Sequence, residues 1–163
     1  MTRAVLSVGS NVGDRLAHLR SVVDRMQPYL GAVSPVYETP PWGPVSQPDY
    51  LNAVILASDE GADPRTWLAR ARAAEDAAGR LRDVRWGPRT LDVDIVAVDN
   101  VEQSDPDLTL PHPRAAERAF VLVPWLVVDP EARLPGGSVA DLVALLPPSE
   151  ISAVHMRPDL VLR

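Results

Sequence analysis

The chain has 163 residues, 16 of them basic and 22 acidic, so its formal net charge is −6, which argues against a nucleic-acid or anionic-membrane binder that works by bulk charge. Its length corresponds to about one domain, and a hydrophobic fraction of 46% allows a sizeable core and is too high for a disordered protein. The sequence contains no cysteine and no lysine, which excludes disulfides, thiol catalysis, cysteine-ligated metals, a P-loop lysine and Schiff-base chemistry.

The first part of the chain predicts strand, helix, strand and strand. Residues 2–8 are β-rich and stop at Gly9, and from Asp14 onward apolar residues recur at helical spacing. Two further β-rich runs follow, separated by a proline-rich loop over residues 40–48. They span residues 33–39 and 50–58.

The next part predicts a second helix and a fourth strand. Asp63 and Pro64 are suited to the N-cap and the first position of a helix, and Gly79 is suited to its C-terminal end. After an arginine-rich loop over residues 80–90, the alternating sequence of residues 91–98 predicts a strand.

The last part predicts helices and an edge strand. Residues 115–128 predict a helix that Pro124 interrupts or ends, and residues 151–163 are expected to add an edge strand. The order βαββαβ followed by helices predicts an α+β sandwich of ferredoxin-like type, with a largely antiparallel sheet covered by helices. Because no repeat or long linker is visible, residues 1–163 are expected to form a single domain.

Neither a secretory signal nor a membrane span is expected. The apolar stretch of residues 4–8 is shorter than a secretory h-region. The longest apolar run, residues 119–128, is about half a membrane span. We therefore expect a cytoplasmic protein.

Two aspartates lie close together in the fourth predicted strand. Asp92 and Asp94 are two residues apart, so both are expected on one face, which Val96 and Val98 continue. The opposite face is apolar, with Leu91, Val93 and Ile95. Two adjacent carboxylates beside a covered surface need a cation or protons to neutralise them, and oxygen ligands of this kind suit magnesium. On the D-x-D pattern alone, a solvated strand end is the alternative.

Four arginines precede these aspartates in the loop before the strand: Arg80, Arg82, Arg85 and Arg89. Guanidinium groups match phosphate oxygens, and together with magnesium held by aspartate they form the clamp used in phosphoryl transfer. Intramolecular salt bridges or solvation are the alternative for these arginines.

A histidine, three aromatic residues and an asparagine are further candidates: His112, Trp42, Tyr50, Phe120 and Asn52. The prolines on both sides of His112 restrict its backbone, so its ring can be fixed to donate to a phosphate. The aromatic rings can stack on a flat heterocycle, whose edge Asn52 can bind through hydrogen bonds. Core packing of the rings, a structural histidine and a solvated asparagine are the alternatives.

Six motifs occur along the chain: Gly9-Ser10-Asn11, TPPWGP at 39–44, QPDYLNAV at 47–54, GR-x-R at 79–82, RWGPRTLDVDI at 85–95 and LPHPR at 110–114. Together they resemble the motifs of the 6-hydroxymethyl-7,8-dihydropterin pyrophosphokinases of folate synthesis. The RWGPRTLDVDI block is long and specific, and the resemblance covers nearly the whole chain, from residue 1 to about residue 148. It implies a ferredoxin-like αβα sandwich, in agreement with the predicted order of elements.

The resemblance implies transfer of the two terminal phosphates of ATP, as one diphosphate, to the hydroxymethyl group of a reduced pterin, leaving AMP. Asp92 and Asp94 match the aspartates that hold two magnesium ions on the triphosphate, with ATP as co-substrate. No residue is an evident general base, so catalysis is expected to depend on positioning and charge neutralisation.

The remaining site residues also follow from the resemblance. Catalytic arginines are implied at Arg80, Arg82 and Arg89. Contacts with ATP are implied for Glu75, Arg82, Trp86, Arg89, Thr109, His112 and Arg118. The pterin pocket is implied to contain Asn11, Thr39, Pro40, Trp42, Tyr50, Asn52 and Phe120. Residues 39–49 and 80–90 flank this site and are candidate lids that exclude water.

Two other functions stay open at this point. One is a magnesium-dependent nucleotidyltransferase or nuclease-like two-metal enzyme, and the other is a non-catalytic ferredoxin-like module that binds a small ligand. The pyrophosphokinase interpretation predicts a monomer that binds small molecules, with neither nucleic acid nor membrane as partner.

Overall fold

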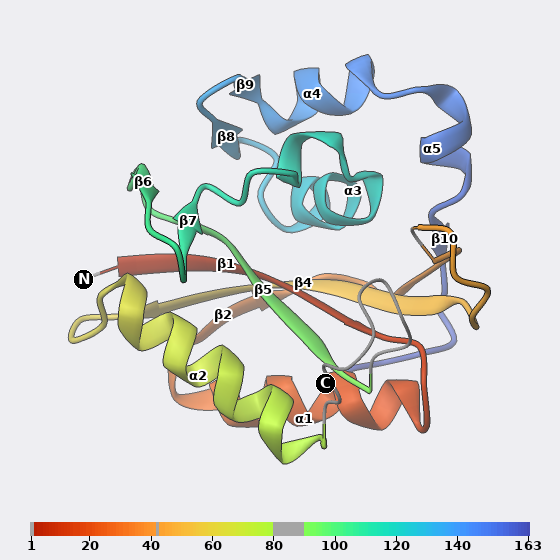
Figure 1. The fold of residues 1–163 in the computed structure, drawn as a ribbon. Helices are drawn as coiled ribbons and strands as arrows, with labels where there is room; N and C mark the ends of the chain where they lie inside the picture. Colours follow the sequence, from red (N-terminus) through yellow and green to blue (C-terminus); the bar gives the residue numbers. More distant parts are fainter. Residues whose placement is uncertain (1, 42, 80–89) are drawn as a thin grey trace.

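A computed structural model describes residues 2–41, 43–79 and 90–163. Figure 1 shows a twisted central sheet with helices on both of its faces. The sheet strands are β1 (Thr2–Ser10), β2 (Leu30–Val33), β3 (Tyr37–Thr39), β4 (Tyr50–Asp59), β5 (Asp92–Val98) and β10 (His155–Met156). Their order is β10-β3-β4-β1-β5, β2 also pairs with β4, and every pairing is antiparallel. The predicted ferredoxin-like α+β fold is confirmed.

Two helices cover one face of the sheet (Figure 1). α1 (Arg15–Met26) begins at Asp14, whose side chain accepts a hydrogen bond from the Ala17 amide. α2 (Pro64–Ala77) begins at Asp63, which forms a reciprocal capping box with Thr66. Both helices bury apolar side chains in the larger core, between the helices and the sheet.

The other face carries α3 (Ala119–Val128), with α4 (Val139–Leu145) and α5 (Pro148–Ser152) beyond it. Two short hairpins accompany these helices, formed by β6 (Gln103–Ser104) with β7 (Thr109–Leu110) and by β8 (Arg133–Leu134) with β9 (Gly137–Ser138). Val54 and Val96 of the sheet pack with Leu122 and Trp125 of α3 in a second core. In the described part of the chain, no helix is long and apolar enough to cross a membrane.

The predicted strand over residues 33–39 is wrong as a single element. β2 ends at Val33 and β3 begins at Tyr37, because Pro35 has no amide hydrogen with which to continue the ladder. Between them, the Ser34 hydroxyl accepts a hydrogen bond from the Val54 amide, at 2.9 Å, so a side chain replaces a strand carbonyl.

The predicted helix over residues 115–128 is also wrong in its details. Residues Ala115–Glu117 form a separate 3-10 turn, and Pro124 lies inside α3 without ending it. A proline within a helix costs about 3 kcal/mol. The burial of Val121, Leu122 and Trp125 on the second core keeps the helix continuous.

The prediction that Val98 continues the face of the aspartates is wrong. The register between β1 and β5 shifts after Val5, which leaves Val96 and Ala97 together in the second core. Val98 therefore turns into the larger core, on the opposite face. The predicted edge strand in residues 151–163 is confirmed, as β10 pairs with the edge of β3.

Candidate active site

The strand register brings several of the predicted site residues onto one face of the sheet. Gly9 of β1 lies opposite both Asn52 of β4 and Asp92 of β5. Directly opposed residues in an antiparallel sheet share a face. Asn52, Gly9 and Asp92 thus form one row across three strands, on the face that carries α3.

Gly9 keeps the middle of this row open. A Cβ atom at this position would lie 2.9 Å from Asn52 Oδ1 and 3.4 Å from Tyr50 Cδ1. The first distance is shorter than real Cβ contacts, so any side chain here would displace Asn52. Gly9 belongs to one of the sequence motifs, but no role was predicted for it; a glycine at the end of a β-rich run is the signal for such a close approach.

Asp92 and Asp94 lie half-buried at the N-terminal end of β5, beside the largely buried Arg118. The Nη1 atom of Arg118 is 3.6 Å from Asp94 Oδ2, and the Arg118 side chain is only 14% exposed. Its Nε is buried and finds no hydrogen-bond partner among the residues described. A buried guanidinium with an unused donor, next to carboxylates, can bind an anionic oxygen.

Glu75 braces the strand that carries the aspartates. β5 is an edge strand, and the buried Glu75 accepts a hydrogen bond from the Val93 amide through Oε2, at 3.0 Å. Val93 separates Asp92 from Asp94, so this bond fixes the backbone between them. A contact between Glu75 and ATP stays a prediction.

His112 is held beside the same aspartates as a neutral ring. Its amide donates to the Val96 carbonyl at 2.8 Å, and its Nδ1 accepts from the Arg114 amide at 3.2 Å. Burial first, and then the positive charge of Arg118, lower the pKa of His112 from 6.5 to about 4, against the opposing effect of Asp92. Since Nδ1 accepts, the proton of the neutral ring is on Nε2, which can donate to a ligand.

The predicted pterin residues gather at the β3–β4 end of the row. Asn52 is buried and donates from Nδ2 to Thr39 Oγ1 at 2.6 Å, and Thr39 pairs with Tyr50 across the two strands. Thr39, Pro40 and Phe120 line a cavity of about 380 Å³. Arg118 lies over Phe120, 5.5 Å from the ring centroid, which links this cavity to the aspartates.

Two of the predicted contact residues have structural hydrogen bonds. Asn11 is buried and donates from Nδ2 to Gln47 Oε1 at 2.8 Å and to the Pro48 carbonyl at 2.9 Å, which anchors the proline-rich loop. Thr109 donates to the Asp105 carbonyl at 3.3 Å, within the connection between β6 and β7. Six residues named as candidates from the sequence lie outside the described residues: Trp42, Arg80, Arg82, Arg85, Trp86 and Arg89.

A protein-family model matches most of this chain. Residues 5–130 match the family model described as 7,8-dihydro-6-hydroxymethylpterin-pyrophosphokinase (HPPK). A Mycobacterium tuberculosis protein named 2-amino-4-hydroxy-6-hydroxymethyldihydropteridine pyrophosphokinase is 50% identical, over 98% of this chain and 92% of that protein. A Methylorubrum extorquens protein of the same name is 42% identical, over 95% of this chain and 100% of its own length.

Solved structures share the fold. A crystal structure of an HPPK-DHPS protein in complex with substrates superposes with a TM-score of 0.66 at 13% identity, over 88% of this chain and 43% of that one. A Plasmodium falciparum HPPK-DHPS structure gives a TM-score of 0.64, also at 13% identity, over 88% of this chain and 45% of the other. The chain thus spans less than half the length of these solved proteins.

Proposed function

The chain belongs to the 7,8-dihydro-6-hydroxymethylpterin-pyrophosphokinase family, and we propose that its reaction takes place along the row formed by Asn52, Gly9 and Asp92. It is a 2-amino-4-hydroxy-6-hydroxymethyldihydropteridine diphosphokinase of folate biosynthesis, with ATP as co-substrate and a reduced pterin as acceptor. The row carries this proposal, because on one face of the sheet it connects the buried Asn52, which is hydrogen-bonded to Thr39 at the cavity beside Phe120, with a pair of carboxylates.

The pterin binds at the Asn52 end of the row. Tyr50 and Phe120 provide rings that can stack on a flat heterocycle, with Thr39 and Pro40 around its rim, and Trp42 is proposed as a further contact. Asn52 uses Nδ2 to donate to Thr39, which leaves Oδ1, on the side of Gly9, as an acceptor for a ring N–H. The absence of a side chain at Gly9 allows the pterin to extend toward Asp92.

ATP binds at the Asp92 end. Arg118 has a buried donor for a phosphate oxygen, and His112 presents Nε2–H beside it. Arg82 and Arg89 grip further phosphate oxygens, and Arg80 belongs to the same loop. Glu75, Trp86 and Thr109 are proposed as further contacts of the nucleotide.

The carboxylates fit magnesium as the ion of the reaction. Asp92 and Asp94 offer only oxygen donors, are half-exposed and project side by side, which suits a hard divalent cation that retains other oxygen ligands. These two residues would hold two Mg²⁺ ions, which when bound neutralise the charge of the triphosphate.

The chemical step is a displacement at the β-phosphorus of ATP. The hydroxymethyl oxygen of the pterin forms a bond to this phosphorus while the bond to the α,β-bridging oxygen breaks, and AMP leaves. The hydroxyl proton passes to water or phosphate, because Asp92 and Asp94 are poor bases when they ligate cations. The chain contributes by aligning the two substrates and by supplying Arg118 and His112 to the developing charge.

The test is AMP formation from ATP and 6-hydroxymethyl-7,8-dihydropterin, with and without magnesium. AMP is expected only when pterin and magnesium are both present, and Asp94→Ala is expected to abolish it. Asp141→Ala, at an exposed position of α4, is the matched control and should retain activity. Release of free diphosphate in place of AMP would indicate nucleotidyl transfer, and unchanged activity of Asp94→Ala would refute the metal site.

A further inference from the structure

We propose that the C-terminal segment, residues 148–157, is part of the pterin pocket. In this proposal α5 and the two residues after it form one wall, and Arg157 is a positioning residue for the strand ends next to the substrate. The inference rests on the proposed function, because it concerns the same pocket. It goes beyond the family match, which ends at residue 130.

The cavity next to Phe120 has two walls that are far apart in the sequence. One wall consists of residues assigned above to the pterin, Thr39 and Pro40, and continues to Gly43. The opposite wall is formed by Ser149, Glu150, Ala153 and Val154. These side chains are small apart from Glu150, so the position of α5 sets how large a group fits beside Phe120.

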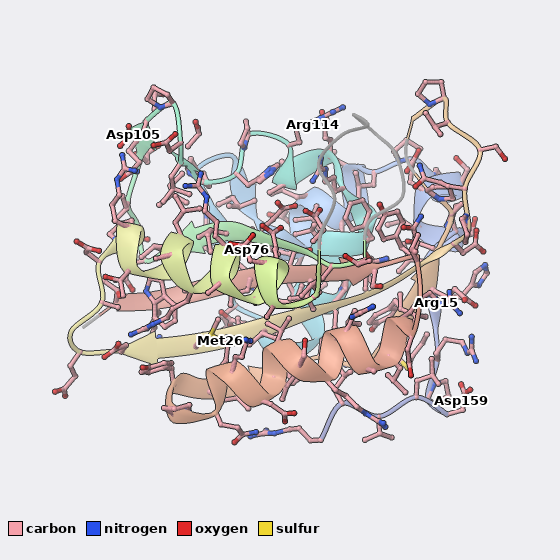
Figure 2. The ribbon with its side chains drawn as sticks, turned by 60° about the horizontal axis from the view of Figure 1, so that its bottom comes forward. Arg15, Met26, Asp76, Asp105, Arg114 and Asp159 are labelled. Carbon is pink, nitrogen blue, oxygen red and sulfur yellow. The ribbon has the colours of Figure 1, made fainter. Side chains whose placement is uncertain are left out.

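A chain of ion pairs connects the segment to the substrate-binding strands. Arg157 Nη1 donates to Glu38 Oε1 at 2.9 Å, and Arg15 Nη1 donates to Glu38 Oε2 at 2.6 Å. The hydrogen bonds from Arg15 and then Arg157 lower the pKa of Glu38, so its carboxylate stays charged. Arg157 is held in turn by Asp159, at 2.8 Å. Figure 2 labels Arg15 and Asp159, the ends of this chain, at the same end of the molecule.

The ion pairs act directly beside two pocket residues. Glu38 precedes Thr39, and Arg15 also donates to the carbonyl of Asp49, at 3.1 Å, immediately before Tyr50. Thr39 and Tyr50 are themselves opposed across β3 and β4. Arg15 and Glu38 therefore fix both sides of the strand pair that carries the pterin residues.

Backbone pairing fixes the C-terminal segment to the same strand. In β10, His155 lies opposite Glu38 and Met156 lies opposite Tyr37. The Arg157 amide continues this ladder and donates to the Val36 carbonyl at 2.7 Å. A shift of the segment would therefore move Glu38 and, with it, the neighbouring Thr39.

The first experiment fills the cavity from its C-terminal wall. Ala153→Phe is expected to raise the KM and the Kd for the pterin by at least about tenfold, with the KM for ATP changed by less than about twofold. Ala144→Phe, at an exposed position of α4, is the matched control and should leave both KM values unchanged. A folded Ala153→Phe protein with an unchanged pterin KM would refute the wall.

The second experiment removes the link to Glu38. Arg157→Ala is expected to raise the pterin KM several-fold without affecting the ATP KM, and Arg157→Lys, which keeps a cation for Glu38, should recover part of the loss. The control is Arg65→Ala, since Arg65 also pairs with two carboxylates, those of Asp105 and Asp107, but outside the pocket. Equal increases in both KM values, or none, in a folded Arg157→Ala protein would overturn the positioning role.

The two proposals fail in different ways. If the wild-type protein forms no AMP in a pterin-dependent manner, the proposed function is wrong. If the wild type is active and binds pterin, but neither Ala153→Phe nor Arg157→Ala changes pterin binding, only the inference about the C-terminal segment is wrong. Thermal unfolding of each variant establishes that it is folded, and Arg157→Ala decides the matter if Ala153→Phe does not fold.

Discussion

At the residue scale, single side chains determine whether the proposed pterin end and the proposed ATP end of the candidate site are open to each other. Gly9 lies between Asn52, for which we propose a contact with the pterin, and Asp92, for which we propose a role in binding magnesium. His112 is fixed by two hydrogen bonds: its backbone amide donates one, and its ring Nδ1 accepts the other. Gly9 leaves space because it has no side chain. His112 can donate from Nε2 because its ring is neutral and its Nδ1 accepts a hydrogen bond.

Gly9→Ala is expected to lower kcat/KM for the pterin by at least about tenfold, or about 1.4 kcal/mol of transition-state binding. The reason is that the added methyl group would lie 2.9 Å from Asn52 Oδ1 and push this side chain out of the pocket. Steady-state kinetics measure the effect. Gly61→Ala is the matched control, because its added Cβ would meet only Asp59 Oδ1, at 3.9 Å. Full activity of Gly9→Ala would mean that Asn52 does not contact the pterin.

His112 is expected to make stability depend on pH on the acidic side. Its pKa is lowered from 6.5 to about 4 in the folded protein, so between these values the unfolded chain binds the proton and the native ring does not. The contribution of His112 to stability is therefore complete above pH 6.5 and is lost as the pH falls through 4. Urea unfolding at several pH values, wild type minus His112→Gln, should show this slope. The same pH dependence in the wild type and in His112→Gln would refute this contribution.

At the scale of elements, the edge position of β5 and the bulge within it determine how the two aspartates are oriented. β5 is an edge strand whose outward amide at Val93 is satisfied by Glu75 of α2. The bulge at Val96 then reverses the side-chain alternation, so the aspartates face α3 while Val98 returns to the core beneath. The helix and the bulge together fix the orientation of the D-x-D pair.

Glu75→Ala is expected to destabilise the protein by about 1–3 kcal/mol, because the buried Val93 amide loses its acceptor. The kcat is expected to fall more than the pterin KM rises, since the strand between the two aspartates loses its brace. Denaturant unfolding and kinetics measure the two effects. Glu102→Ala removes an exposed carboxylate and should change neither quantity. An undiminished kcat in Glu75→Ala would limit Glu75 to a purely structural role.

Sequence patterns predicted those elements whose local signals agree with their packing. The helical spacing of apolar residues after Asp14, the predicted cap at Asp63 and the alternation around Asp92 identified helices and strands that the structure contains. The break at Pro35, the continuity of α3 through Pro124 and the bulge at Val96 were missed, because they depend on partners distant in the sequence. Arg157 was missed for the same reason, since its partner Glu38 lies 119 residues away.

At the scale of the whole molecule, the two faces of the sheet differ in what packs against them. The larger core binds α1 and α2 to one face through side chains that are almost wholly buried, such as Leu19, Trp67 and Ile55. The other face carries both the second core and the candidate site, and α3 contributes to both, since Phe120 packs against this core and lines the cavity. Substrate binding should therefore change the hydrogen-exchange protection of the two faces unequally.

Hydrogen exchange tests this asymmetry. We expect residues 39–49, and residues 80–90 if they act as the second lid, to gain protection when an ATP analogue, magnesium and the pterin are added together. Amides of α1 and α2 should change little, because their contacts lie on the opposite face of the sheet (Figure 1). The control is the ATP analogue without pterin, which should leave residues 39–49 unchanged, since Thr39 and Pro40 line the cavity beside Phe120. Uniform protection of both faces would instead indicate general tightening of the fold, and no gain in either loop would contradict closure over the substrates.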